Sequence, residues 1–363
     1  MINISLNQIS IVLSFLTAFL VTYTAIPSII RIVEVKYLFD IPGNRNVHEK
    51  ITPTLGGIAI FAGLILSIAL WSDSVEFPDF QYIVAATIVI FFIGVKDDIL
   101  IIAPLTKMIG QLMAAIIITI LCDLRITNLH GFSGIFEIPY IISILLSIFI
   151  IIVIINGFNL IDGIDGLASG IGIVTASTYG VWFFLVGEYN YVIVATALTG
   201  SLLAFFRFNI AKNKNKIFMG DTGSLIIGLI LSILTIKFNE LNLNETIPYR
   251  ILPAPSVSFG ILIMPLFDIL RVMFIRIIIN ESWFKGDKNH VHHILLSLGF
   301  SHLKATLILV LANVFFIAFV FIFSGMSIRR LILLILVLAV FLSYIPAYLS
   351  ERKKKKANRK KES

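Results

Sequence analysis

The chain has 363 residues, of which 58% are hydrophobic and only 13% are charged, and its mean hydropathy is +1.00. Soluble domains contain about 25% charged residues, so this composition excludes a soluble globular protein and indicates a polytopic membrane protein. The single cysteine, Cys122, excludes an internal disulfide, and no Cys/His spacing typical of a zinc site is present.

Apolar runs of about twenty residues, long enough to cross a bilayer, follow one another along the chain. The first run lacks a basic n-region and a cleavage site, which favours a retained helix over a signal peptide. We predict an all-α, polytopic integral membrane protein with about eleven transmembrane helices. A single transmembrane domain would cover 1–350, followed by a basic cytoplasmic tail over 351–363. The predicted spans are 8–30, 55–71, 80–96, 104–122, 138–156, 166–187, 190–207, 223–238, 250–275, 303–324 and 328–349.

Basic residues predict the orientation of these spans. An odd number of spans places the two chain ends on opposite sides, and Lys and Arg concentrate in the loops that share a side with the C-terminus. The N-terminus is therefore expected outside and the C-terminus in the cytoplasm. The net charge of +7 comes mostly from these loops and the tail. We interpret the tail as binding membrane lipids rather than nucleic acid.

Polar clusters fall only at the predicted cytoplasmic ends of the spans. Because such ends share one face of the membrane, we expect a single cytoplasmic-face site formed by segments far apart in sequence. In chain order the clusters are 45–57 with Arg45, His48 and Lys50, then Asp97-Asp98, then Asn156, Asn159, Asp162 and Asp165, then 218–224, then 287–293.

The third cluster is the most informative. Its two amides and two carboxylates are spaced three residues apart, directly after the apolar stretch 141–155. Steps of three drift slowly around a helix, so the four side chains are predicted to share roughly one half of one helix. An intramembrane carboxylate costs about 2.5–3.5 kcal/mol, which favours a site that uses it. The alternative interpretation is that Asn, Asp and Gly simply terminate the helix here.

Five acids at one interface need a positively charged partner. Mg²⁺, or Mn²⁺ in its place, suits them because it prefers oxygen ligands and is usually held by one or two carboxylates plus substrate phosphates. Four lysines and the histidine cluster would complement phosphate oxygens: Lys107, Lys212, Lys214 and Lys216. Phosphoryl transfer depends mainly on positioning and charge neutralisation, and these residues supply both. The acids are Asp97, Asp98, Asp162, Asp165 and Asp221.

Other interpretations stay open for single residues and for the whole chain. The Asp97-Asp98 pair would suit a solvated helix end, three nearby histidines would suit a transition-metal site, and Phe218 alone would suit packing. A secondary transporter would place its site near the bilayer midplane between paired halves, and neither feature is visible. A non-catalytic lipid-binding protein would be expected to lose some of the acids.

The clusters together resemble the polyprenyl-phosphate N-acetylhexosamine-1-phosphate transferases. The resemblance covers roughly residues 40 to 300. Val291 within the histidine motif favours the bacterial undecaprenyl-phosphate N-acetylglucosaminyl-1-phosphate transferases over the phospho-N-acetylmuramoyl-pentapeptide transferases, which usually carry three consecutive histidines. The resemblance rests on four motifs: Asp97-Asp98, residues 156–167, residues 218–225 and His290-Val291-His292-His293.

The resemblance implies a reaction and a place in the cell. A polyprenyl phosphate, expected to be undecaprenyl phosphate, would attack the β-phosphorus of a UDP-N-acetylhexosamine, with Mg²⁺ assistance. The products would be UMP and a polyprenyl-diphospho-sugar, the first membrane intermediate of a cell-envelope glycan. UDP-N-acetylglucosamine is the expected donor and the bacterial inner membrane the expected location. A homodimer is left open, and no nucleic-acid partner is expected.

The resemblance also implies a role for each residue. Asp221 and Asn159 would be metal ligands, and Asp97, Asp98 and Asp165 would be catalytic acids or bases. Phe218 would stack on uracil. The substrate-binding residues would be Asn156, Asp162, Phe218, Lys107, Arg271, His290, His292 and His293.

Overall fold

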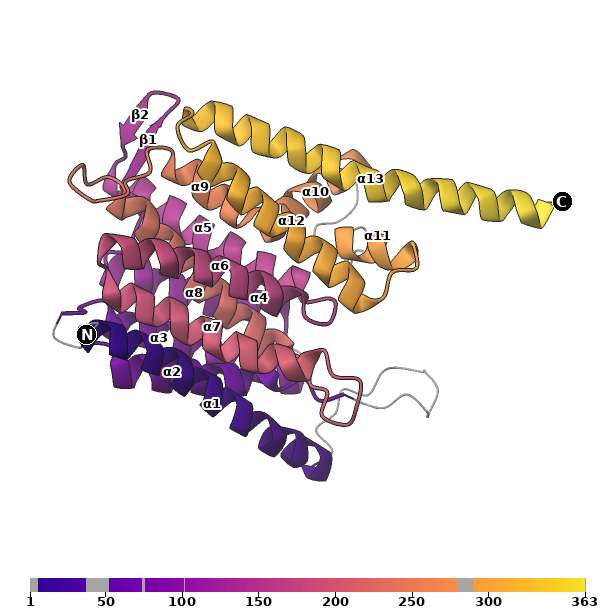
Figure 1. Ribbon diagram of the computed structural model, residues 1–363, viewed down its shortest axis with the longest axis horizontal. Helices are drawn as coiled ribbons and strands as arrows, with labels where there is room; N and C mark the ends of the chain where they lie inside the picture. The colour runs from indigo at the N-terminus through magenta and orange to yellow at the C-terminus, as the bar shows by residue number, and fades with distance from the viewer. Residues whose placement is uncertain (1–5, 37–51, 74–75, 101, 280–289, 363) are drawn as a thin grey trace, which may run out of the picture.

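The computed structural model describes residues 6–36, 52–73, 76–100, 102–279 and 290–362, which form a helical bundle with one small hairpin (Figure 1). Arg45, His48, Lys50 and the segment 287–289 of the predicted clusters lie outside the described residues. The elements are α1 (Leu6–Lys36), α2 (Gly56–Trp71), α3 (Phe80–Leu100), α4 (Pro104–Ile116), the π-helix η1 (Ile117–Leu121), β1 (Asn128–Phe132), β2 (Ile135–Glu137), α5 (Tyr140–Ile161), α6 (Leu167–Val186), α7 (Tyr189–Asn209), α8 (Gly220–Leu241), α9 (Ala254–Ile261), α10 (Ile263–Ile279), α11 (Val291–Ser297), α12 (His302–Ile322) and α13 (Ile328–Glu362).

The prediction of an all-α membrane protein is confirmed. Among the described residues, eight helices are long and apolar enough to cross a membrane. The pair α9 and α10, bent by 83°, would make nine if it counts as one span. All eleven predicted segments lie on helices. The sixteen-residue α2 is only about 24 Å long, which is short for a hydrocarbon core of about 30 Å.

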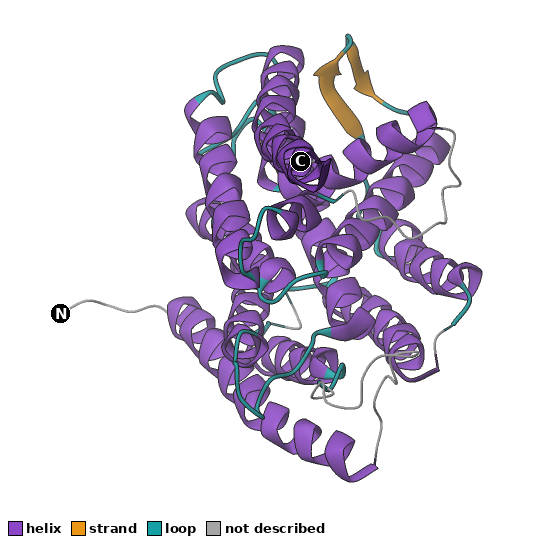
Figure 2. Cartoon of the chain, turned by 90° about the vertical axis from the view of Figure 1, so that its right-hand side faces the viewer, coloured by secondary structure: helices purple, strands orange, loops and turns teal. Residues whose placement is uncertain are grey.

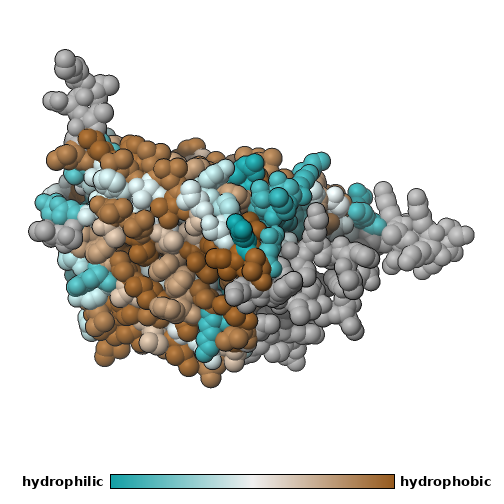
Figure 3. All heavy atoms as spheres, turned by 90° about the horizontal axis from the view of Figure 1, so that it is seen from below, coloured by the Kyte–Doolittle hydropathy of each residue, from teal (hydrophilic) through white to brown (hydrophobic). Residues whose placement is uncertain are grey.

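The exposed surface fits this assignment. Figure 3 shows an extended apolar surface along the bundle, with hydrophilic side chains gathered toward its ends. Large apolar side chains on the outer helices, such as Leu333 of α13 and Phe315 of α12, are exposed. A continuous apolar surface of this kind is suited to contact lipid. The tail residues continue α13 rather than forming a separate segment.

Helix α8 lies at the centre of the bundle. Most of its side chains are buried, and α2, α3, α5 and α6 pack around it. Small residues permit close approach at its first turn, because a Cβ at Gly57 would overlap the backbone of Gly223 and one at Gly94 would overlap Thr222. Close helix packing through small residues is common in membranes. The start of α8 is thereby held against the end of α3.

The two ends of the bundle differ. The acid end is the end where α3 and α5 finish and α8 begins, and Figure 2 views the molecule from this side. The hairpin end carries β1 and β2, which pair antiparallel with Asn128 opposite Glu137. This hairpin is not part of the predicted all-α pattern. Gly131 and Gly134, both with positive φ, allow its tight turn.

Candidate active site

A cavity of about 420 Å³ opens at the acid end. It joins the end of α3, the end of α5, the loop before α8 and the start of α12, segments far apart in sequence. The cavity therefore brings together Asp97, Asp98, three of the four side chains of the third cluster and the start of the 218–224 segment, as expected from the sequence, but not Asn156. The lining residues are Thr54, Asp97, Asp98, Asn159, Asp162, Gly163, Ile164, Asp165, Asn209, Phe218, Met219, Gly220, Asp221 and His302.

The predicted common helical face of the third cluster was wrong. Helix α5 ends at Ile161, so Asn156 and Asn159 lie on the helix, whereas Asp162 and Asp165 lie in the turn before α6. Gly166, with φ of +79°, makes this turn possible. The two carboxylates therefore project into the cavity from a turn rather than from the side of a helix.

The ammonium group of Lys107 occupies a position surrounded by oxygens. Its Nζ lies 2.8 Å from Asp221 Oδ2 and 3.2 Å from Asp97 Oδ2, and it donates to Asn159 Oδ1 at 3.3 Å. The Asn159 amide nitrogen donates to Asp221 and to Ser224 Oγ, which turns its oxygen toward the ammonium. Three helices thus place oxygens around one position that already holds a positive charge.

This donor set is suited to a hard divalent cation. Among the described residues, no three Asp, Glu, His or Cys side chains lie close enough to hold a metal by themselves. Mg²⁺ does not need such a group, because one or two carboxylates with waters and substrate phosphates usually suffice. Asp97, Asp221 and Asn159 supply two carboxylates and an amide oxygen. The chemistry of the donors fits Mg²⁺, provided that the substrate completes the shell.

Asp98 is engaged by the first turn of α8. Its carboxylate accepts the backbone N–H of Asp221 at 2.6 Å and that of Thr222 at 3.1 Å. It also accepts the Thr222 hydroxyl at 2.6 Å. A carboxylate at a helix N-terminus satisfies unpaired N–H groups and interacts favourably with the helix dipole. Asp98 therefore fixes the helix that carries Asp221.

Substitution of Asp98 should lower stability as well as activity. Loss of a helix cap typically costs about 0.5–2 kcal/mol, and Asp98 caps α8 from another helix. We expect the melting temperature to fall in the order wild type, Asp98→Asn, Asp98→Ala, because the amide retains one acceptor oxygen and alanine retains none. Thermal unfolding of the purified variants by intrinsic fluorescence measures this order. Unchanged melting temperatures in both variants would remove the capping role.

Asp162 differs from the other acids of the cavity. Its carboxylate makes no hydrogen bond or ion pair within the described part of the chain, although the cavity surrounds it. Burial raises the pKa of Asp162 well above its ordinary value, and the negative charges of Asp221, Asp98 and Asp165 add to the effect. A carboxyl group with a raised pKa and no fixed partner is suited to accept or release a proton.

Asp165, in contrast, has fixed partners. Its carboxylate forms an ion pair with Lys216 at 2.7 Å and lies 3.3 Å from His302 Nδ1. The Thr306 hydroxyl donates to its backbone carbonyl at 2.7 Å. These contacts connect the turn after α5 to the loop before α8 and to α12. Lys216 is one of the basic residues expected from the sequence to complement phosphate oxygens, whereas His302 was not identified, because it belongs to no motif.

The ring of Phe218 lines the cavity and is partly exposed. The residue is 38% exposed, and Lys216 Nζ lies 5.0 Å from the ring centroid. Its backbone is fixed, because its N–H donates to Pro53 and its carbonyl accepts the N–H of Gly56. A core residue would be buried, so packing alone does not explain this ring. The geometry suits stacking of a flat ligand.

The histidine motif lies behind the turn rather than in the cavity. His290 Nδ1 lies 2.7 Å from Asp268 Oδ2, and the buried His292 ring packs against Gly163 of the turn. The His293 ring lies 4.3 Å from that of His292. Arg271 follows Asp268 by one turn of α10, and like the motif it does not line the cavity. Asp268 was missed from the sequence, although an acid within an apolar helix is a signal of function.

His292 should make stability depend on pH. Burial lowers the pKa of His292 to about 4, and His293 adds to the shift. An unfolded histidine titrates near 6.5, about the ordinary value. The unfolded state therefore binds more protons between these values, and the free energy of unfolding should fall as the pH falls from about 6.5 to 4.

Melting temperatures of His292→Gln between pH 7 and pH 5 test this expectation. The variant should lose part of the pH dependence but not all of it, because burial also lowers the pKa of His130 to about 4. An unchanged pH slope in His292→Gln would contradict the assignment.

Asn156 lies deeper in the bundle than the cavity. Its amide nitrogen donates to Gln111 Oε1 at 2.8 Å and to the carbonyl of Ile152 at 2.8 Å. Gln111 is almost fully buried and donates back to Asn156 Oδ1 at 3.3 Å. This pair joins α4 to α5 one turn below Asn159. Direct substrate contact by Asn156 stays a prediction, and the structure gives it a supporting contact instead.

Comparison with known proteins identifies the family. Residues 80–239 match the model of glycosyl transferase family 4. The chain is 30% identical over 321 residues to decaprenyl-phosphate N-acetylglucosaminephosphotransferase from Mycobacterium tuberculosis, covering 82% of this chain and 78% of that protein. The chain belongs to the polyprenyl-phosphate N-acetylhexosamine-1-phosphate transferase family. The family match spans Asp97 to Asp221, whereas the histidine motif lies beyond it.

Two further relatives of this family come from other bacteria. The probable undecaprenyl-phosphate N-acetylglucosaminyl 1-phosphate transferase of Bacillus subtilis is 29% identical over 340 residues, with 93% of this chain and 92% of that protein covered. The undecaprenyl-phosphate alpha-N-acetylglucosaminyl 1-phosphate transferase of Escherichia coli K12 is 28% identical, with 76% and 73% covered.

Proposed function

We propose that this protein transfers N-acetylglucosamine-1-phosphate from UDP-N-acetylglucosamine to undecaprenyl phosphate and releases UMP. The observation that carries the proposal is the convergence of Asp97, Asn159 and Asp221 on one cation position, beside the exposed ring of Phe218. The family relatives act, by their names, on undecaprenyl or decaprenyl phosphate and on N-acetylglucosamine.

In this proposal Asp221 and Asn159 would hold Mg²⁺, with Asp97 beside it, and the ion would supply positive charge to the donor diphosphate. Lys107, whose ammonium lies among these oxygens in the structure, would supply a second positive charge beside the ion. Asp98 holds the first turn of α8 so that Asp221 keeps its position. Phe218 stacks on the uracil ring, and Lys216 next to it faces a phosphate of the donor.

The reaction forms one bond and breaks one. An oxygen of the acceptor phosphate attacks the β-phosphorus of the donor, and the bond between that phosphorus and the bridging oxygen of UMP breaks. The second pKa of a phosphate monoester is about 6, so part of the acceptor carries a proton at neutral pH. Asp162, the carboxylate without a fixed partner, accepts this proton. Asp165 orients the turn that carries it.

The acceptor explains why the cavity lies at the end of the helices. A polyprenyl tail stays in the bilayer while its phosphate meets a water-soluble nucleotide. We place the acid end on the cytoplasmic side of the bacterial inner membrane, with the N-terminus outside, because basic residues concentrate in the loops at that end.

Cysteine labelling tests this orientation. In a Cys122→Ser background, Ser133→Cys at the hairpin end should react with an impermeant maleimide added to intact spheroplasts. Asn213→Cys at the acid end should react only after permeabilisation. Both positions are exposed, so access through the membrane decides the result. The reverse pattern would place the acid cavity on the wrong side for a cytoplasmic nucleotide.

The activity itself is tested with the purified protein, undecaprenyl phosphate and Mg²⁺. Each member of a panel of UDP-sugars is supplied in turn, and UMP release is measured. We expect release with UDP-N-acetylglucosamine, dependence on the acceptor, and loss on adding EDTA. Release that is independent of the acceptor, or no release with any UDP-N-acetylhexosamine, would overturn the proposal.

A further inference from the structure

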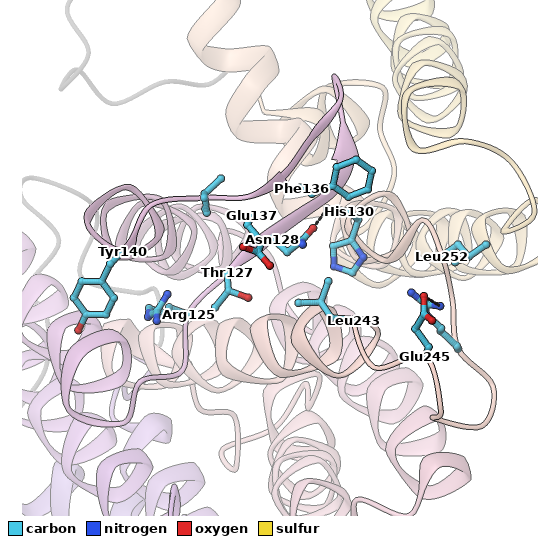
Figure 4. A pocket seen from close by; sticks show the side chains of 12 residues that line it. Arg125, Thr127, Asn128, His130, Phe136, Glu137, Tyr140, Leu243, Glu245 and Leu252 are labelled. Carbon is cyan, nitrogen blue, oxygen red and sulfur yellow. Dashed lines mark hydrogen bonds and ion pairs between the residues drawn. The ribbon is translucent and has the colours of Figure 1, made fainter.

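A second cavity, larger than the acid cavity, lies at the hairpin end of the bundle. Its volume is about 700 Å³, against about 420 Å³ for the acid cavity. Its walls are the β1–β2 hairpin and the segment 242–252 that follows α8 (Figure 4). The 22-residue α5 separates the two cavities by about 33 Å. The proposed transfer reaction uses none of its residues.

Hydrogen bonds fix both walls of this cavity, which we call the hairpin cavity. Glu240 accepts the backbone N–H of Thr127 at 2.8 Å and its hydroxyl at 2.7 Å. On the other wall, Asn242 Oδ1 accepts the N–H of Ile251 at 2.6 Å, and its carbonyl accepts Arg250 Nε at 3.0 Å. The Glu240 bonds join segments 113 residues apart, whereas the Asn242 bonds hold the loop that follows α8. The cavity is therefore formed before any ligand arrives.

The charged residues that line the cavity balance one another. They comprise two guanidinium groups, Arg125 and Arg250, and two carboxylates, Glu137 and Glu245. Glu137 makes no ion pair among the described residues. A site for an anion would show an excess of cations, and a site for a cation the reverse. The lining instead offers donors and acceptors together, which suits hydroxyl groups because each hydroxyl both donates and accepts.

His130 adds an unsatisfied polar atom. Its Nε2 is buried and has no hydrogen-bond partner in the described chain. Its backbone adopts φ of 53°, an uncommon conformation for a residue with a side chain. Burial lowers the pKa of His130 to about 4, with Arg250 adding to the shift, so the ring is neutral at pH 7. Figure 4 shows this ring among the lining residues. Buried polar atoms are normally paired, so the unpaired nitrogen marks this wall of the cavity as incompletely satisfied.

Aromatic rings supply the apolar part of the lining. Phe136 is 63% exposed and Tyr140 is 52% exposed. The Arg125 guanidinium lies 4.5 Å from the centroid of the Tyr140 ring, which fixes both groups. A pyranose ring presents C–H groups on its faces and hydroxyls on its rim. The faces of the Phe136 and Tyr140 rings match the C–H groups of a sugar, and the neighbouring guanidinium and carboxylate groups match its hydroxyls.

We propose that the hairpin cavity binds a saccharide, at the end of the bundle opposite the proposed transfer site. The volume lies within the range of about 300–1,000 Å³ that is usual for small-molecule sites. Arg250 and Glu137 bind hydroxyls from opposite walls, and Phe136 packs on a sugar face. The saccharide is either free in solution or attached to a lipid of that leaflet.

Binding is tested with the full chain in phosphatidylcholine nanodiscs prepared without sugar-containing detergent. The probe is chitobiose, with excess UDP present to occupy the proposed transfer site. Calorimetry should show saturable binding. Glu137→Gln should weaken binding by about tenfold, because the charged acceptor of a hydrogen bond is lost. Phe136→Ala should weaken it by a similar factor, because the ring that packs on the sugar face is lost. Phe132→Ala is the matched control, because Phe132 lies on the same hairpin but outside the cavity lining.

Two further measurements identify the source of the saccharide and test whether the variants are folded. The same disaccharide on a dialkylglycerol lipid distinguishes a membrane-attached source from a free one, and binding of either form supports the proposal. UMP release by Glu137→Gln and Phe136→Ala should equal that of the wild type, which shows that the variants are folded. Three results would overturn the proposal: binding of inorganic phosphate but not of chitobiose, no binding of either saccharide form, or wild-type affinity in both cavity variants.

Discussion

Asp221→Asn is expected to lower the rate of transfer by at least about 10²–10³, the usual effect of removing one preorganised charge-stabilising group. The Asp221 carboxylate lies 2.8 Å from Lys107 Nζ and accepts the amide of Asn159, so it is central to the cation position. An amide keeps the shape of the side chain but loses the charge that a hard cation needs. Initial rates of UMP release at saturating Mg²⁺ measure the effect.

The matched control for this substitution is Asp123→Asn at the hairpin end. Asp123 also forms an ion pair, with Arg125, and its side chain is 65% exposed. The same chemical change there should leave the transfer rate unaltered. Detergent-extracted Asp221→Asn should elute and melt like the wild type. A loss of activity below about twofold would assign Asp221 a minor role, well short of the expected range.

Phe218→Ala is expected to weaken binding of the UDP-sugar by about 1–3 kcal/mol, the range for base stacking on an aromatic side chain. The KM for the donor should rise by roughly 5- to 150-fold, while the KM for undecaprenyl phosphate stays nearly constant. Phe218→Tyr and Phe218→Trp should retain much of the activity, because each keeps a ring face. Phe218→Leu should not, despite its similar hydrophobicity.

The opposite rank order would follow if Phe218 served only packing. Leucine would then be tolerated better than tryptophan, since overpacking typically costs about 1–3 kcal/mol. Steady-state kinetics with donor and acceptor varied separately distinguish the two. Phe300→Ala is the control, because Phe300 is 40% exposed, close to the 38% of Phe218, and lies outside the acid cavity. Leucine above tryptophan, without a donor-specific change, would end the stacking assignment.

The convergence of the acids could be predicted because it depends on simple features. Apolar runs fix which helix ends share a face of the membrane, and Asp97, Asn159 and Asp221 stand at three such ends. The turn at Asp162 could also have been predicted, since Gly163 and Gly166 interrupt the helical pattern. Counting steps of three from Asn156 gave too much weight to periodicity at a helix end.

The partners of these acids could not be predicted. Asp98 caps a helix that begins more than one hundred residues later, and that contact requires the close packing of α3 on α8. Lys107 meets three oxygens from three different helices. The hairpin cavity depends in the same way on contact between Thr127 and Glu240. Such contacts follow from tertiary packing, which short-range patterns do not specify.

Transfer of the β-phosphate is the step that defines the proposed chemistry, and radiolabelled donors follow it directly. UDP-N-acetylglucosamine labelled with ³²P at the α- or the β-phosphorus is incubated with the purified protein, undecaprenyl phosphate and Mg²⁺, and the mixture is extracted with organic solvent. The β-label should enter the lipid phase and the α-label should stay in water as UMP. Sugar in the lipid phase without the β-label, or no label in the lipid phase, would contradict sugar-1-phosphate transfer by this protein.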